Sequence, residues 1–137
     1  MRDFTAVLSR NMVFENMNEG IIILDVQLTV LEMNPAAEWM LGYANWEVKG
    51  QSYENLLIGS DRFLPALQEA LEGKQTHDIG KASLNRRNGQ SFPVKAKVMP
   101  GISGEQIRYI EVFLADISEH EHSKALTQQL EHRAVLG

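Results

Sequence analysis

The chain of 137 residues is long enough for one domain with a single hydrophobic core, and its 44% hydrophobic and 23% charged residues exclude a disordered or collagen-like protein. A net charge of -5 with scattered Lys and Arg argues against nucleic-acid binding, and the lack of cysteine excludes disulfides, thiolate zinc sites and cysteine nucleophiles. Because no apolar run approaches the ~20 residues of a membrane helix, and the first ten residues lack the apolar core of a signal peptide, we expect a cytoplasmic chain without a membrane segment.

The first third of the chain predicts a helix followed by two strands. Apolar residues recur near helical spacing in residues 3–17, from Phe4 to Phe14, so we predict an amphipathic helix over residues 1–17. Residues 20–26 and 28–33 are β-prone runs joined by a tight connection. The unbroken Ile-Ile-Ile-Leu stretch predicts a strand that is covered on both faces.

Helix signals follow the second strand. Asn34 and Pro35 predict a helix start, and Gly42 predicts its end, with brief helical turns before Gly59. Ser60 and Asp61 are predicted to cap a longer helix that ends at Gly73.

Three strands are predicted after that helix. Asn88 and Gly89 predict a type I′ hairpin turn, in which both central residues take positive φ. In the strand after the turn, apolar residues alternate with Pro93, Lys95 and Lys97, so one face is predicted to be buried. Residues 106–116 become apolar on both faces, which favours a central strand.

The end of the chain predicts one uninterrupted helix. Ser118 and Glu121 have the spacing of a capping box. Leu126, Leu130 and Ala134 fall four residues apart among polar residues, so they are the candidate contacts of a dimeric helix.

This order of elements, together with four local motifs, resembles a PAS domain. The motifs span residues 14–121 and read "GIIILD", "NPAAEWMLGY" running into "WEVKG", "NRRNGQSFPV" and "LADISEH". The resemblance implies an α+β fold with a five-stranded antiparallel sheet of order 2-1-5-4-3. Short helices and one longer helix would cover one face, with residues 18–117 as the core of the domain.

The segment "QQLEHRAVLG" resembles the lead-in to the dimerisation helix of bacterial sensor histidine kinases. Residues 118–137 would then be a signalling helix leading to a kinase domain further along, and the chain a homodimer through its N-terminal and C-terminal helices. His120, His122 and His132 lack the phospho-acceptor setting, and no ATP-binding or catalytic motif is present, so this chain is not expected to be an enzyme by itself.

Two functional hypotheses remain open from the sequence. The first is a sensory input domain of a two-component histidine kinase that binds a ligand or a partner and controls ATP-dependent autophosphorylation. The second is a PAS dimerisation or adaptor module with a filled core, in a diguanylate cyclase, a transcription regulator or another signalling protein.

The resemblance implies a ligand pocket between the sheet and the helices, although the same pattern fits a filled core. The candidate lining residues are Trp39, Met40, Phe63, Leu67, Val94, Ala96 and Val98. The resemblance also implies that the junction between the last strand and the exit helix couples the pocket to the effector, with its acidic residue bonding back to the fold. The junction residues are Asp116, Ile117 and Ser118.

We expect no bound cofactor. A cysteinyl flavin adduct is excluded because the chain has no thiol. Haem would need His77, which is interpreted as a water-exposed residue at a strand end. Non-covalent flavin could stack on Trp39 or Trp46, which are interpreted instead as packing aromatics. No metal site is expected, since His120 and His122 are two apart on a helix and point to different sides.

Overall fold

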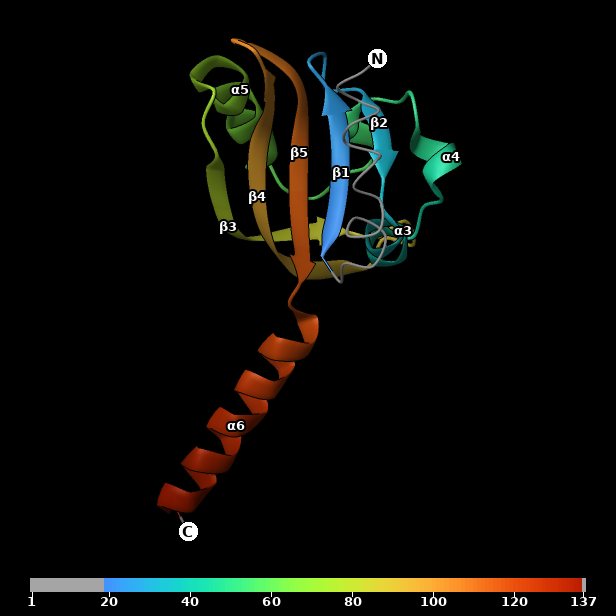
Figure 1. The fold of residues 1–137 in the computed structure, drawn as a ribbon. Coiled ribbons are helices and arrows are strands. Elements are labelled where there is room, and N and C mark those ends of the chain that lie inside the picture. The colour runs from blue at the N-terminus through green and yellow to red at the C-terminus, as the bar shows by residue number, and fades with distance from the viewer. Residues whose placement is uncertain (1–18, 137) are drawn as a thin grey trace.

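The computed structural model describes the backbone of residues 19–136 and the side chains of residues 19–127. Within them lies a five-stranded antiparallel sheet of order β2-β1-β5-β4-β3, as predicted (Figure 1). β5 is therefore flanked on both sides. The strands are β1 (Gly20–Asp25), β2 (Val30–Met33), β3 (His77–Asn85), β4 (Ser91–Ser103) and β5 (Gln106–Asp116).

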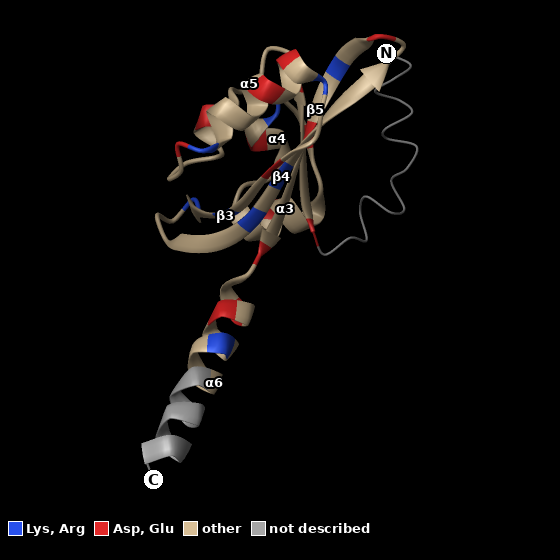
Figure 2. Ribbon diagram, turned by 90° about the vertical axis from the view of Figure 1, so that its left-hand side faces the viewer, with Lys and Arg blue, Asp and Glu red and all other residues tan. Residues whose placement is uncertain are grey.

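The short helices and the longer helix cover one face of the sheet, and the exit helix leaves the domain (Figure 2). The short helices are α3 (Pro35–Leu41), α4 (Asn45–Val48) and the 3-10 turn η1 (Tyr53–Asn55), and the longer helix is α5 (Phe63–Gly73). The exit helix is α6 (Ser118–Leu136). The helix predicted over residues 1–17 lies outside the described residues. In the described part of the chain, no helix is long and apolar enough to cross a membrane.

β1 is buried on both of its faces, as the unbroken apolar run predicts. Ile22 and Leu24 belong to the main core beneath the helices. Ile21 and Ile23 are buried on the opposite face, where partly buried Leu31, Tyr109 and Phe113 pack against them. β1 and its neighbour β5 therefore lie within the sheet, each flanked by two strands.

Asn34 fixes the start of α3 against β1. Its Oδ1 accepts hydrogen bonds from the backbone N–H of Ala37 at 3.0 Å and of Ile21 at 2.8 Å, and its Nδ2 donates to the carbonyl of Glu19 at 2.9 Å. Asn34 is fully buried. The predicted start at Asn34 and Pro35 is confirmed, and Gly42 ends the helix with a φ of 85°.

The predicted cap of the longer helix is wrong. α5 begins at Phe63 with Arg62 at its N-cap position, and no side chain caps it. Ser60 Oγ instead accepts from the N–H of Arg62 at 3.2 Å, which builds a local turn before the helix. Gly73 is the last helical residue, and Lys74 takes the left-handed conformation with a φ of 55°.

The hairpin between β3 and β4 exists, but its turn is not type I′. Only Gly89 of the predicted pair has a positive φ, at 90°. The N–H of Gly89 donates to Arg86 O at 2.9 Å, and Asn88 Oδ1 accepts from the N–H of Gln90 at 2.9 Å. This pattern fits a three-residue loop in which glycine supplies a bulge after a type I turn.

Candidate functional site

Six of the seven predicted pocket residues lie together in the core between the sheet and the helices. Phe63 and Leu67 come from α5, and they pack in one buried cluster with the predicted pocket residues of α3 and β4. Phe63 is 1% exposed, and Leu67, Val94 and Val98 have no exposed surface. A side chain without accessible surface touches no space that a water molecule could enter, so the interior around these side chains is packed. The remaining two residues of the six are Met40 and Ala96.

The seventh predicted pocket residue, Trp39, lies outside the core, so this prediction is wrong. It is 90% exposed. α3 buries Ala37, Met40 and Leu41, and the helical turn of 100° per residue puts Trp39 on the opposite side. Trp46 is 80% exposed for the same reason, since α4 buries only Val48. Neither indole is a packing aromatic, and neither reaches the core where a flavin would stack.

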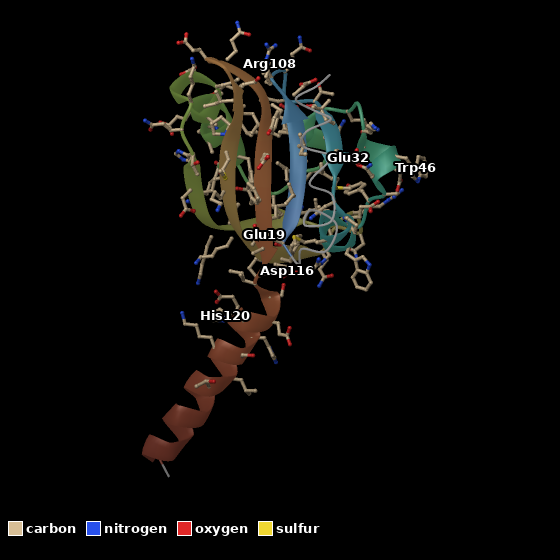
Figure 3. The ribbon with its side chains drawn as sticks, in the orientation of Figure 1. Glu19, Glu32, Trp46, Arg108, Asp116 and His120 are labelled. Carbon is tan, nitrogen blue, oxygen red and sulfur yellow. The ribbon has the colours of Figure 1, made fainter. Side chains whose placement is uncertain are left out.

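Asp116 ends β5 at the point where the chain turns into α6 (Figure 3). Its Oδ1 accepts from the backbone N–H of Ser118 at 2.9 Å and from the Ser118 hydroxyl at 2.6 Å. Its Oδ2 lies 3.0 Å from Nη2 of Arg86. The predicted capping box between Ser118 and Glu121 is therefore wrong, because Asp116, two residues earlier, holds Ser118 instead.

Arg86, in the loop between β3 and β4, connects three elements at this junction. Besides Asp116, its guanidinium donates from Nη1 to the carbonyl of Met40 at 2.5 Å, in the last turn of α3. The guanidinium carbon also lies 3.9 Å from the centre of the Phe92 ring, on β4. Sequence reasoning did not single out Arg86, although an arginine inside the "NRRNGQSFPV" motif was the available signal.

The first turn of α6 is held by two further contacts. The N–H of Ile117 donates to the carbonyl of Pro93 at 3.1 Å, on β4. Glu121 Oε1 lies 2.6 Å from Nζ of Lys81, on β3. From residue 122 to residue 127 every side chain is exposed, so the described contacts between α6 and the sheet end at Glu121.

Two junction carboxylates have lowered pKa values. Burial alone would raise the pKa of Asp116, but bonds from the Ser118 hydroxyl, the Ser118 N–H and Arg86 hold it below its usual value. The hydrogen bond from Lys81 lowers the pKa of Glu121 against a smaller opposing effect of desolvation. Both groups therefore favour their charged forms in the folded protein.

The junction is expected to weaken in acid. A carboxylate with a lowered folded pKa contributes stability that is complete above its unfolded pKa, about 4, and is lost as the pH falls through the folded value. We expect Asp116→Asn, which keeps an oxygen for Ser118 but loses the pair with Arg86, to melt below wild type at pH 7. The difference should shrink below about pH 4. A melting difference that is independent of pH between 7 and 3 would contradict this assignment.

Outside the core and the junction, the described surface contains a depression of about 320 Å³ at the end of α5. His77 lies there at the start of β3, with Nδ1 2.7 Å from Glu69 and its side chain 40% exposed. His77 lies at a strand end, as expected, but it is only partly exposed and pairs with Glu69 on α5. Its register opposite Val98 puts it on the helix-covered side of the sheet, at the edge strand. Among the described residues, no three His, Asp or Glu side chains are gathered to hold a metal ion.

The family model described as the PAS fold matches residues 10–117. The chain belongs to the PAS family. Among curated proteins, its sequence is similar to the signal transduction histidine-protein kinase AtoS of Escherichia coli (strain K12), with 28% identity over 127 residues. That alignment covers 93% of this chain and 21% of the relative, so the PAS chain spans about a fifth of that kinase's length.

Solved PAS domains share the fold. The PAS domain of nitrogen regulation protein NR(II) from Vibrio parahaemolyticus has a TM-score of 0.69 and 22% identity, covering 79% of this chain and 97% of that one. A PAS domain from Colwellia psychrerythraea has a TM-score of 0.71 and 20% identity, covering 83% and 98%. The sheet order and the helices on one face are thus those of a PAS domain.

Proposed function

We propose that this PAS domain is the signal-input module of a cytoplasmic sensor histidine kinase region, and that it passes its state through α6 to a kinase domain further along the protein. The contact set of Arg86 carries this proposal. One guanidinium touches the last turn of α3, the Phe92 ring and the carboxylate that holds the first turn of α6. The likeness to the AtoS kinase over 93% of the chain supports the type of effector.

The mechanism that we propose is a change in how the first turn of α6 is held. Any movement of α3 relative to the hairpin loop must change the bond between Arg86 and Met40, and with it the position of Arg86 beside Asp116. Asp116 holds Ser118, so the helix start moves with it. A helix whose described contacts with the domain lie at its first turn converts such a shift into rotation or a change of register, and two such states give a switch.

For the input, a protein partner fits better than a ligand enclosed in the core. Leu67, Val94 and Val98 have no exposed surface, so a ligand would have to displace packed side chains. We expect the purified protein to show no absorption band in the visible range. A flavin or haem band that stays with the protein through gel filtration would contradict an input by surface contact.

The packed core also favours the second candidate, a PAS adaptor module that senses nothing itself. An adaptor does not need a coupled junction, so the two functions differ in what Asp116→Asn does. In an adaptor that substitution leaves the activity of the downstream domain unchanged. In the proposed input module it changes the rate of autophosphorylation.

We further propose that α6 pairs with its copy in a homodimer, together with residues 1–17. Leu126 is 49% exposed on the part of α6 that leaves the domain. Leu130 and Ala134 continue the same spacing along the sequence.

The double substitution Leu126→Gln and Leu130→Gln is expected to weaken dimerisation at least tenfold, because it puts polar groups into the apolar seam of the paired helices. The melting temperature of the domain should stay within a few degrees of wild type, since Leu126 lies beyond the last contact with the sheet. Sedimentation equilibrium measures the dimer, with Thr127→Gln as a matched control. A monomeric variant that melts far lower would mean that α6 packs on its own domain.

A further inference from the structure

Both tryptophans of the chain lie on the surface, on neighbouring helices. The sequence contains two tryptophans, Trp39 and Trp46, and they are 90% and 80% exposed. Tryptophan is highly buried on average, and where a surface carries it, it is among the residues that contribute most to protein binding. Two such side chains within eight residues make the α3–α4 edge a distinctive apolar feature of the described surface.

Hydrogen bonds hold these two helices in a fixed relation. Glu38 Oε2 on α3 accepts from the N–H of Asn45 at the start of α4, at 2.7 Å. Glu47 Oε1 accepts from the N–H of Ala44 at 2.9 Å, and Asn45 Oδ1 accepts from Met33 N–H at 2.9 Å, on β2. The Glu38 side chain therefore ties α3 to the backbone at the start of α4, and each tryptophan follows one of the two bonded residues in the chain. The backbone that carries the two tryptophans is therefore preorganised for binding.

Carboxylates accompany the indoles at this edge. Figure 3 shows Trp46 pointing outward from α4, with Glu32 on the adjacent strand β2. Asn45 Nδ2 donates to Glu32, and Asn45 N–H donates to Glu38, so both carboxylates are bound by neutral partners. Neither forms an ion pair with Lys or Arg among the described residues, unlike Glu47, which pairs with Arg87 at 2.5 Å. Their negative charges are left for an external cation.

We propose that the α3–α4 surface, defined by Glu32, Glu38, Trp39 and Trp46, binds a segment of a partner protein that carries Lys or Arg side chains. The exposed indoles and the carboxylates without an ion pair suit that chemistry. A guanidinium or ammonium group is attracted to the face of an indole, and carboxylates beside the ring supply the matching charge. An anionic membrane, the other common target of exposed tryptophans, would be repelled by the same carboxylates.

This surface is connected to the junction through α3. The residue after Trp39 is Met40, whose carbonyl accepts the hydrogen bond from Arg86. The next carbonyl, that of Leu41, accepts from the N–H of Arg87 at 2.8 Å. A partner that binds Trp39 therefore acts on α3, the helix that Arg86 links to Asp116. The proposed binding names the input of the proposed function. The effect of binding on the kinase rests on that function, whereas the binding itself does not depend on it.

The test uses the 137-residue chain and two synthetic peptides, an amphipathic helix with Arg on its polar face and the same peptide with Glu in place of Arg. Since the tryptophans lie only at this surface, the intrinsic tryptophan fluorescence reports on it directly. We expect the free protein to emit like tryptophan in water. The Arg peptide should shift the emission to shorter wavelength in a saturable way, and the Glu peptide should leave it unchanged.

Glu32→Gln with Glu38→Gln removes two charges but keeps an amide oxygen for Asn45. We expect this double variant to bind the Arg peptide about threefold to tenfold more weakly. Glu72→Gln with Glu105→Gln, which removes two exposed carboxylates elsewhere, should bind like wild type. Calorimetry with Trp39→Ala plus Trp46→Ala should show loss of binding while the melting temperature stays near that of wild type.

Four results would overturn the proposal. The first two are equal weakening of binding by both Glu-to-Gln pairs, and no binding of the Arg peptide. The third is a blue shift of the emission that grows with protein concentration, which would mean that a second copy of the chain binds this surface. The fourth is a shift with anionic vesicles that matches the shift with the peptide. None of these results bears on autophosphorylation, so failure of this proposal is distinguishable from failure of the proposed function.

Discussion

Replacing Asn34 with alanine is expected to lower the free energy of unfolding by about 3–5 kcal/mol, the largest single effect that we predict. The Asn34 side chain satisfies the N–H groups of Ile21 and Ala37 and the carbonyl of Glu19. Asn34 is fully buried, so these groups would lose their partner where water does not replace it easily. A buried group left unpaired costs about 1–3 kcal/mol.

Chemical denaturation at pH 7 measures this loss, and the melting temperature should fall by about 10–17 °C. Asn55→Ala is the matched control, because Asn55 is exposed and its side chain makes one long hydrogen bond of 3.3 Å to Gln51. The control should change stability by no more than about 0.5 kcal/mol. Equal stabilities for the two variants would show that Asn34 does not tie α3 to β1.

Replacing Arg86 with alanine is expected to release the first turn of α6 and to lower the free energy of unfolding by about 2–3 kcal/mol. The variant leaves Asp116 without its cation, the carbonyl of Met40 without a donor and one face of Phe92 uncovered. Hydrogen exchange of the amides of residues 118–122 should become faster, because Asp116 no longer holds a fixed position at the helix start. Arg86→Lys should give an intermediate result, since one ammonium cannot make all three contacts.

The neighbouring arginine supplies the control for this prediction. Arg87 pairs with Glu47 at 2.5 Å, but its side chain is 55% exposed and it does not contact α6 in any interaction that the described residues show. Arg87→Ala should cost no more than about 1 kcal/mol and leave the exchange of residues 118–122 unchanged. If the two arginine variants affected those amides equally, Arg86 would not be the link between the domain and α6.

The sequence predicted the fold because its strongest local signals agree with its long-range packing. Asn34 before Pro35 gives a helix start in isolation, and in the fold the same amide also bonds to β1. The apolar run from Ile21 to Leu24 predicts a strand buried on both faces, which is what β1 becomes. Alternation after the hairpin placed Val94, Ala96 and Val98 in the core for the same reason.

The wrong prediction for Trp39 depended on which side of a short helix faces the core. Trp39 was expected inside by analogy with PAS domains, whereas helical geometry places Ala37, Met40 and Leu41 inside. In a seven-residue helix, helical periodicity decides which few positions face the core, so the hydrophobicity of one residue does not determine whether it is buried. Arg86 was missed because its role depends on contacts with three elements that are far apart in the sequence. A local sequence pattern does not predict such long-range contacts.

The most direct test of the central claim is the autophosphorylation rate of the protein that carries this chain with its downstream region, wild type against Asp116→Asn. The substitution keeps an oxygen for Ser118 and removes the charge that Arg86 binds. If α6 passes the state of the PAS domain to a kinase, the rate should change at least severalfold while the far-ultraviolet spectrum stays that of a folded domain. An unchanged rate in a protein that still phosphorylates itself would contradict transmission through this junction.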